Sequence, residues 1–171
     1  RVSSDKVVIA DIDETSLQDD RMGQWPWPRH KIAALVDKLT AMGAKAIAFD
    51  MVFAEEDRTS PSVLIRNIPD DHLTPEMLAQ VNSLDSHDII LAKAFQASGR
   101  VVTGFTLSQS SAATRHAPTL SRPIMMKNIN ARDDFKLLMT AGVTTNILPL
   151  EQAAAGNGSF GVFPESDGVI R

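Results

Sequence analysis

Apolar and polar positions alternate in blocks along the first third of the chain. Residues 6–12 form a nearly continuous apolar run, which is typical of a strand buried on both faces of a parallel sheet. From Pro28, apolar residues follow at helical spacing up to Gly43, which has the conformational freedom to end a helix. A second apolar run covers residues 44–53. The pattern predicts two parallel strands, side by side, joined by one helix in a right-handed crossover.

The pattern weakens in the middle of the chain. A polar, proline-rich excursion over the surface is expected for residues 54–87, with a helix that Thr74 caps and Pro75 starts. Asp88 is predicted to cap the next helix, which Gly99 ends. The other expected elements, in chain order, are a strand over residues 101–107, a Ser/Thr-rich loop over 108–122, short helices over 135–139 and 148–155, and a Gly-rich strand over 158–163.

Length, charge and composition narrow the fold class and exclude several functions. With 171 residues, 43% of them hydrophobic, the chain can bury one sizeable core. We predict an α/β fold with a mostly parallel central sheet and helices on both faces. A net charge of -4 and the lack of a Lys/Arg cluster argue against nucleic acid as a partner. Because the chain has no cysteine, disulfides, thiol catalysis and zinc-thiolate sites are excluded. No apolar run reaches the roughly 20 residues that a membrane helix requires.

Three aspartates lie at the expected ends of the two predicted strands. Side chains two positions apart on a strand point to the same face, so Asp11 and Asp13 should share a side. Asp50 should lie at the corresponding end of the neighbouring strand, at the carboxyl edge where open α/β sheets bind ligands. Like charges this close need a cation, backbone donors or a basic side chain, and Arg29 is the nearest candidate. A structural role is equally open, in which Asp11 and Asp13 accept hydrogen bonds from loop amides and Asp50 caps a turn.

The chain has two tryptophans, Trp25 and Trp27, and the prolines at positions 26 and 28 stiffen the backbone around them. This rigidity suits either the frame of a pocket or packing in the core, and core packing is the commoner use of tryptophan. The four histidines lack metal-ligand spacing, and there is no Ser-centred elbow, phosphate loop or dinucleotide fingerprint. The sequence therefore predicts neither a metal site nor a cofactor.

Four blocks, in order and widely spaced, resemble the CHASE-type-two sensory domain: VVIADIDETSL, GQWPWPRHKIAALVDKL, GAKAIAFDMVFAEED and GNGSFGVFPESDGVIR. The resemblance implies an extracytoplasmic (periplasmic) input domain of a bacterial transmembrane receptor. The output domain of such a receptor is an adenylate or diguanylate cyclase, a histidine kinase or a serine/threonine kinase. The resemblance also implies a homodimer that senses an unknown small-molecule or environmental signal and has no catalytic residue in this domain.

The same resemblance sets expectations for the extent of the domain and for its site. Residues 1–171 are expected to form a single sensor domain that is a fragment of a longer one, with a sheet incomplete at the C-terminus, because family domains extend past the Asp-Gly-Val-Ile-Arg block. Flanking transmembrane helices are expected outside the chain. The ligand-binding or signalling candidates, which match recurring positions of the family, are Asp11, Asp13, Trp25, Trp27, Arg29, Asp50, Asp167 and Arg171.

A second family shares the first block. Asp-Ile-Asp-Glu-Thr after an apolar strand is similar to the first motif of haloacid-dehalogenase-like phosphatases. That similarity implies Asp11 as nucleophile and Asp13 as general acid and base, with magnesium held between them. Such an enzyme also needs a lysine and an acidic pair at strand ends, for which Lys127, Asp133 and Asp134 are the only plausible residues. The Trp-Pro-Trp-Pro-Arg block has no role in that mechanism, so the magnesium-dependent phosphatase is the alternative function.

Overall fold

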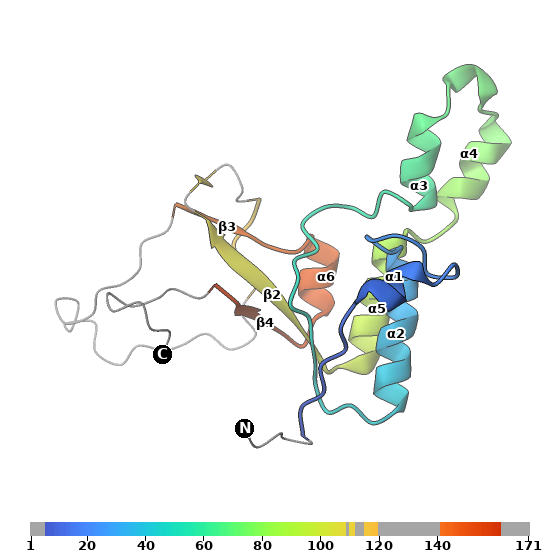
Figure 1. Ribbon diagram of the computed structural model, residues 1–171. Coiled ribbons are helices and arrows are strands. Elements are labelled where there is room, and N and C mark those ends of the chain that lie inside the picture. Colours follow the sequence, from blue (N-terminus) through green and yellow to red (C-terminus); the bar gives the residue numbers. More distant parts are fainter. Residues whose placement is uncertain (1–5, 109, 112–114, 120–140, 162–171) are drawn as a thin grey trace.

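The computed structural model describes residues 6–108, 110–111, 115–119 and 141–161 (Figure 1). The described residues form helices and strands, with five consecutive helical elements between the first and the second strand. In chain order they are α1 (Glu14–Gln18), α2 (Arg29–Ala41), β1 (Ile47–Ala48), α3 (Pro61–Leu64), η1 (Ile65–Asn67), η2 (Asp70–His72), α4 (Pro75–Asn82), α5 (His87–Ser98), β2 (Val101–Ser108), β3 (Gly142–Thr144), α6 (Leu148–Ala153) and β4 (Gly156–Ser159).

Strand β2 is the centre of the sheet. Its first half pairs in parallel with β1 on one side and with β4 on the other, so that Ile47 lies opposite Val101 and Thr103 opposite Asn157. Its last residues, beyond the reach of these partners, pair antiparallel with β3. The predicted α/β class is therefore confirmed, whereas the sheet is mixed and a mostly parallel sheet is not confirmed. Helices on both faces of the sheet stay a prediction.

The first predicted strand is wrong. Residues 7–13 form neither strand nor helix, and the side chains of Val7, Val8 and Ile9 are 72%, 87% and 85% exposed. Within the described ranges, β1 pairs with β2 and with no strand from the N-terminal segment. An apolar run becomes a strand only where a neighbouring strand accepts its backbone hydrogen bonds, and no described strand pairs with this run. The predicted parallel pairing of residues 6–12 with residues 44–53 is therefore absent.

The helix of the predicted crossover is confirmed as α2. Pro28 stands just before it, and Gly43 follows its end with a φ of 90°, a left-handed conformation that side chains with a Cβ disfavour. Ile32 and Val36 lie on its buried face, which packs on α5, and α5 in turn packs on α6. The buried core consists of Ile32, Ala33, Val36, Ile47, Phe53, Leu91, Ala94, Phe95, Val101 and Leu150.

The helix boundaries further along are mostly where local signals put them. Thr74 caps α4 by accepting the backbone N–H of Met77 at 3.2 Å, as predicted. Gly99 ends α5 with a φ of 61°, also as predicted. The cap of α5 is a correction, because Ser86 and not Asp88 accepts the N–H of residue 89. Asp88 lies instead in the first turn of α5, where its carboxylate accepts a hydrogen bond from the guanidinium of Arg29.

The polar excursion contains α3 and α4, which pack on each other and extend away from the other helices in Figure 1. Neither helix has a buried residue, so the predicted position on the surface is confirmed. Helix α6 and strand β4 fall near the short helix and Gly-rich strand expected at the C-terminal end. The helix expected over residues 135–139 lies outside the described residues.

Candidate functional site

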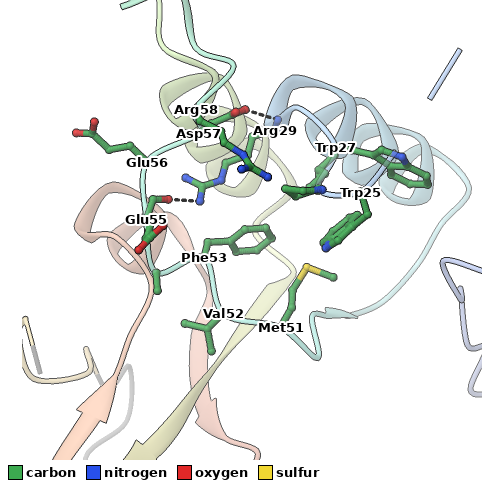
Figure 2. Close-up of a pocket in the computed structure, with 13 residues that line it drawn as sticks. Trp25, Trp27, Arg29, Met51, Val52, Phe53, Glu55, Glu56, Asp57 and Arg58 are labelled. Atoms are coloured by element: carbon green, nitrogen blue, oxygen red, sulfur yellow. Dashed lines mark hydrogen bonds between the residues drawn. The ribbon is translucent and has the colours of Figure 1, made fainter. Parts of the chain in front are cut away.

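A half-open pocket of about 540 Å³ lies between the turn before α2 and the segment after β1 (Figure 2). Two short stretches of chain supply its walls. Residues 25–27, Arg29 and Ile32 form one wall, and residues 51–58 form the other. The size is within the usual range of small-molecule sites, and the mixture of aromatic, aliphatic and charged side chains is typical of them. We refer to this cavity as the Trp25 pocket.

The two tryptophans have different roles in this pocket. Trp27 is 8% exposed, and its indole N–H donates a hydrogen bond of 2.8 Å to the carbonyl oxygen of Gly23. Trp25 is 42% exposed, and its ring meets that of Trp27 edge-on with centroids 5.8 Å apart. Trp27 thus fixes the turn against the body of the domain, and Trp25 presents a large apolar face to the cavity. Core packing therefore describes Trp27, and the frame of a pocket describes Trp25.

Arg29 closes one end of the pocket. Its side chain is buried, and its guanidinium donates hydrogen bonds to the carboxylate of Asp88 and to the backbone carbonyl of Glu55. The guanidinium carbon lies 5.3 Å from the centroid of the Phe53 ring, within cation–π range. A buried arginine needs such partners, because an unpaired charge in this environment is strongly unfavourable.

Asp57 joins the same network from the opposite wall. Its carboxylate accepts the backbone N–H of Arg29 at 2.6 Å and the backbone N–H and hydroxyl of Thr59 at 2.8 and 2.7 Å. Burial raises the pKa of Asp57, but the hydrogen bonds from Arg29 and Thr59 outweigh it and hold the pKa below its ordinary value of 3.8. The backbone N–H of Asp57 in turn donates to Asp88 at 3.1 Å.

His87 completes the network at the start of α5. Its Nδ1 lies 3.2 Å from the carboxylate of Asp57 and 3.0 Å from the hydroxyl of Thr59. Its ring also meets that of His30 with centroids 4.4 Å apart. Burial is the main cause that lowers the pKa of His30 below its ordinary value of 6.5, and the electrostatic interaction with His87 is the second. The start of α2, the wall after β1 and the start of α5 are thus held together by polar contacts.

The same wall is also attached to the C-terminal part of the core. The backbone N–H of Phe53 donates to the side chain of Asn146 at 2.9 Å, and the carbonyl of Phe53 accepts the N–H of Ile147 at 2.8 Å. The side-chain amide of Asn146 donates to the carbonyl of Gly104 at 3.0 Å and to the carboxylate of Glu151 at 3.1 Å. A movement of the pocket wall would therefore act directly on β2 and α6.

The predicted acidic rim is not part of this pocket. Asp11, Asp13 and Asp50 are exposed, and none of them lines the cavity. The guanidinium of Arg29, which was expected to neutralise them, pairs with Asp88 instead, because the strand that would place Asp11 and Asp13 at the sheet edge does not form. Over the ranges that the structure describes, no group of three or more His, Cys, Asp or Glu side chains is placed to hold a metal ion.

Asp13 has the structural role that the sequence left open. Its carboxylate caps α1 by accepting the backbone N–H of Ser16 at 2.9 Å and the Ser16 hydroxyl at 2.8 Å. The hydrogen bond from the Ser16 backbone, then that from its side chain, hold the pKa of Asp13 below its ordinary value of 3.8. Asp167 and Arg171 lie outside the described residues and stay predictions.

Sequence reasoning missed the partners of Arg29. Asp57 carries a weak local signal, since an aspartate two residues before a threonine often closes a turn on that threonine. Asp88 was interpreted as a helix cap, and nothing local distinguishes a capping aspartate from one that binds a distant arginine. Asn146 and Glu151 were missed for the same reason, because their buried contacts join segments far apart in the sequence.

The comparison with family models decides the family. The model of the CHASE2 domain matches residues 1–171, the whole chain. The chain belongs to the CHASE2 domain family. CHASE2 domains are extracytoplasmic sensory domains of signalling receptors and are not themselves catalytic. The resemblance inferred from the four sequence blocks is therefore confirmed.

Two other comparisons give no match for this CHASE2 domain, neither among curated proteins nor among solved structures. In the described part of the domain, no helix combines the length and apolar character needed to cross a bilayer. The phosphatase alternative gains no support, because the family is a sensory one and Asp11 and Asp13 do not follow a strand. Its remaining candidates, Lys127, Asp133 and Asp134, lie outside the described residues.

Proposed function

We propose that this CHASE2 domain is the signal-sensing input domain of a bacterial transmembrane receptor and that the Trp25 pocket binds its small-molecule signal. The output domain in this proposal is an adenylate or diguanylate cyclase, a histidine kinase or a serine/threonine kinase. The observation that carries the proposal is the pocket itself. Trp25, Trp27 and Arg29 form one of its walls, and the opposite wall, residues 51–58, is attached to α5, β2 and α6.

A ligand acts on such a domain only if it binds one arrangement better than another. The Trp25 pocket suits this requirement, because its two walls come from separate segments. One wall continues into α2, whereas the other bonds to α5 through Asp57 and to β2 and α6 through Phe53 and Asn146. A molecule between the walls would favour one separation of these elements over another.

We further propose that the receptor works as a homodimer. Receptors that span a membrane with few helices commonly transmit a signal by changing how paired subunits lie against each other, and this support is an analogy between receptor classes. Sedimentation of the detergent-solubilised full-length receptor tests it. Two subunits per particle are expected, and a responsive monomer would contradict this part of the proposal.

Because this chain has no cysteine, a single introduced cysteine can carry a covalent occupant to a chosen place. Met51→Cys places the thiol in the pocket, and the matched control Leu84→Cys places it on a residue that is 58% exposed and does not line the pocket. Both are made in the full-length receptor and treated with methyl or benzyl methanethiosulfonate. The turnover of the output domain is then measured relative to the equally treated unsubstituted receptor.

We expect the benzyl adduct at position 51 to change output turnover several-fold, the methyl adduct to change it less, and neither adduct at position 84 to change it. Equal responses at both positions, or none at position 51, would contradict the pocket assignment. The Leu84→Cys receptor also tests the location of the domain. A membrane-impermeant maleimide should label it in intact cells, and labelling only after lysis would contradict an extracytoplasmic site.

A further inference from the structure

The charges around the Trp25 pocket are not balanced evenly. The Arg29 guanidinium is paired with Asp88, and the carboxylate of Asp57 accepts hydrogen bonds from the backbone N–H of Arg29 and from Thr59 and lies 3.2 Å from Nδ1 of His87. The two glutamates at the rim also have basic neighbours. Glu56 lies 3.5 Å from a guanidinium nitrogen of Arg66, and Glu55 lies 3.9 Å from one of Arg115.

Arg58 is the exception among the charged residues of the wall. It lines the pocket and is exposed, and no carboxylate in the described ranges lies within ion-pair distance of it. Figure 2 shows it next to Asp57, at the Arg29 end of the cavity, away from Met51. Its neighbour Arg29 adds a second guanidinium nearby, although that group is already paired. Arg58 is therefore the one charged side chain of the pocket lining that has no ion-pair partner among the described residues.

The opposite end of the pocket is apolar. The exposed face of Trp25 and the thioether of Met51 line it, and the ring of Phe53 forms part of the floor. Burying an aromatic or aliphatic group against such a surface is favourable by roughly 25 cal/mol per Å² of apolar area. Guanidinium groups bind carboxylates through two parallel hydrogen bonds, which fixes the orientation of the ligand as well as its charge.

We propose that the Trp25 pocket takes a small organic carboxylate with an apolar body, its carboxylate on Arg58 and its body against Trp25 and Met51. This inference rests on the proposed function of the pocket and adds the chemical class of the signal. A cationic ligand would be repelled by Arg58, and a neutral one would not form the charge-assisted pair of hydrogen bonds with its guanidinium.

The two tryptophans of the chain both lie at this pocket, so their fluorescence reports directly on its occupant. Phenylacetate, phenethylamine and 2-phenylethanol carry the same ring with a negative, a positive and no charge. Each is titrated into the full 171-residue chain, and into Arg58→Gln, Arg58→Lys and Arg21→Gln variants. Arg21→Gln is the matched control, because it removes the same charge from an exposed residue that does not line the pocket.

We expect phenylacetate to change the fluorescence with saturation and at least tenfold tighter than phenethylamine or 2-phenylethanol. Arg58→Gln should weaken phenylacetate at least tenfold, Arg58→Lys should keep the preference for the anion with lower affinity, and Arg21→Gln should change nothing. Unchanged urea midpoints of all three variants show that the fold is intact, as expected for exposed positions.

Three results would overturn the inference. Tighter binding of phenethylamine would show that the pocket takes a cation, while leaving it a small-molecule site as proposed. Equal loss of phenylacetate affinity in Arg58→Gln and Arg21→Gln would show a general charge effect. The absence of a saturable response to any of the three probes would reject the carboxylate class. The cysteine adducts at position 51 test separately whether the pocket controls the output domain.

Discussion

The segment before α1 and the turn before α2 look equally suited to form a site when only the sequence is known. Both follow or precede apolar runs, and both contribute charged residues to the blocks that match the family. In the structure they differ sharply. Arg29 of the turn is 8% exposed, with its guanidinium on Asp88 and its backbone N–H on Asp57. Asp11 and Asp13 are exposed, and the carboxylate of Asp13 accepts hydrogen bonds within its own helix start. Contacts with distant segments therefore hold Arg29 at the pocket, whereas the carboxylate of Asp13 is engaged at the start of its own helix.

The largest expected effect comes from breaking the contacts of the turn. Arg29→Ala leaves the buried carboxylate of Asp88 without its counter-charge, so the free energy of unfolding should fall by about 3–5 kcal/mol. Urea denaturation followed by circular dichroism measures it. The control is Arg21→Ala, which removes an exposed arginine paired with Asp19 and should leave the urea midpoint unchanged. Equal effects of the two substitutions would show that burial of Arg29 does not matter.

The second comparison uses one chemical change at two places. Val36→Ala deletes two methyl groups from a side chain that is 0% exposed, so it should cost about 2 kcal/mol of unfolding free energy. Val8→Ala makes the same deletion in the N-terminal segment, where the side chain is 87% exposed, and should be close to neutral. A cost at Val8 similar to that at Val36 would show that the N-terminal segment is packed after all.

The third prediction concerns pH. The pKa of Asp57 in the folded protein lies below its ordinary value of 3.8, so its stabilising contribution is present above that pH and is lost as the pH falls through the folded pKa. Asp57→Asn removes this contribution. Its urea midpoint should therefore fall less steeply with acid than that of the unsubstituted chain, in titrations on both sides of pH 3.8. Parallel curves would mean that Asp57 has the same pKa folded and unfolded.

The smallest expected effect is at the N-terminal segment itself. Asp13→Ala removes the cap of α1, a helix of five residues with no buried side chain. We expect faster hydrogen exchange at the Ser16 amide, which loses its acceptor, and an unchanged urea midpoint. Global destabilisation would show that α1 contributes to the core in a way that the structure does not indicate.

The sequence predicted well what local chemistry determines. Spacing of apolar residues located α2, and Gly43 and Gly99 marked helix ends because few other residues adopt a positive φ at low cost. Thr74 located the start of α4 through its side-chain cap. The Trp-Pro-Trp-Pro-Arg turn was singled out as a candidate on its composition, and it does line the pocket.

The sequence failed where distant segments decide the outcome. Arg29 binds Asp57 and Asp88, which are 28 and 59 positions further along the chain, and no periodic pattern connects them. The apolar run at residues 7–9 has the composition of a strand, yet a strand also needs a neighbour, and composition does not supply one. Asp50 was placed beside Asp11 only through that missing strand.

The central claim is that sensing occurs at the Trp25 pocket and not at the acidic N-terminal segment. The most direct measurement compares two full-length receptors by the turnover of their output domain. Met51→Trp fills the pocket, whereas the double substitution Asp11→Asn and Asp13→Asn removes the charges of the segment. We predict that filling the pocket shifts turnover several-fold and that removing the charges leaves it unchanged. A shift with the aspartate substitutions and none with Met51→Trp would contradict the account.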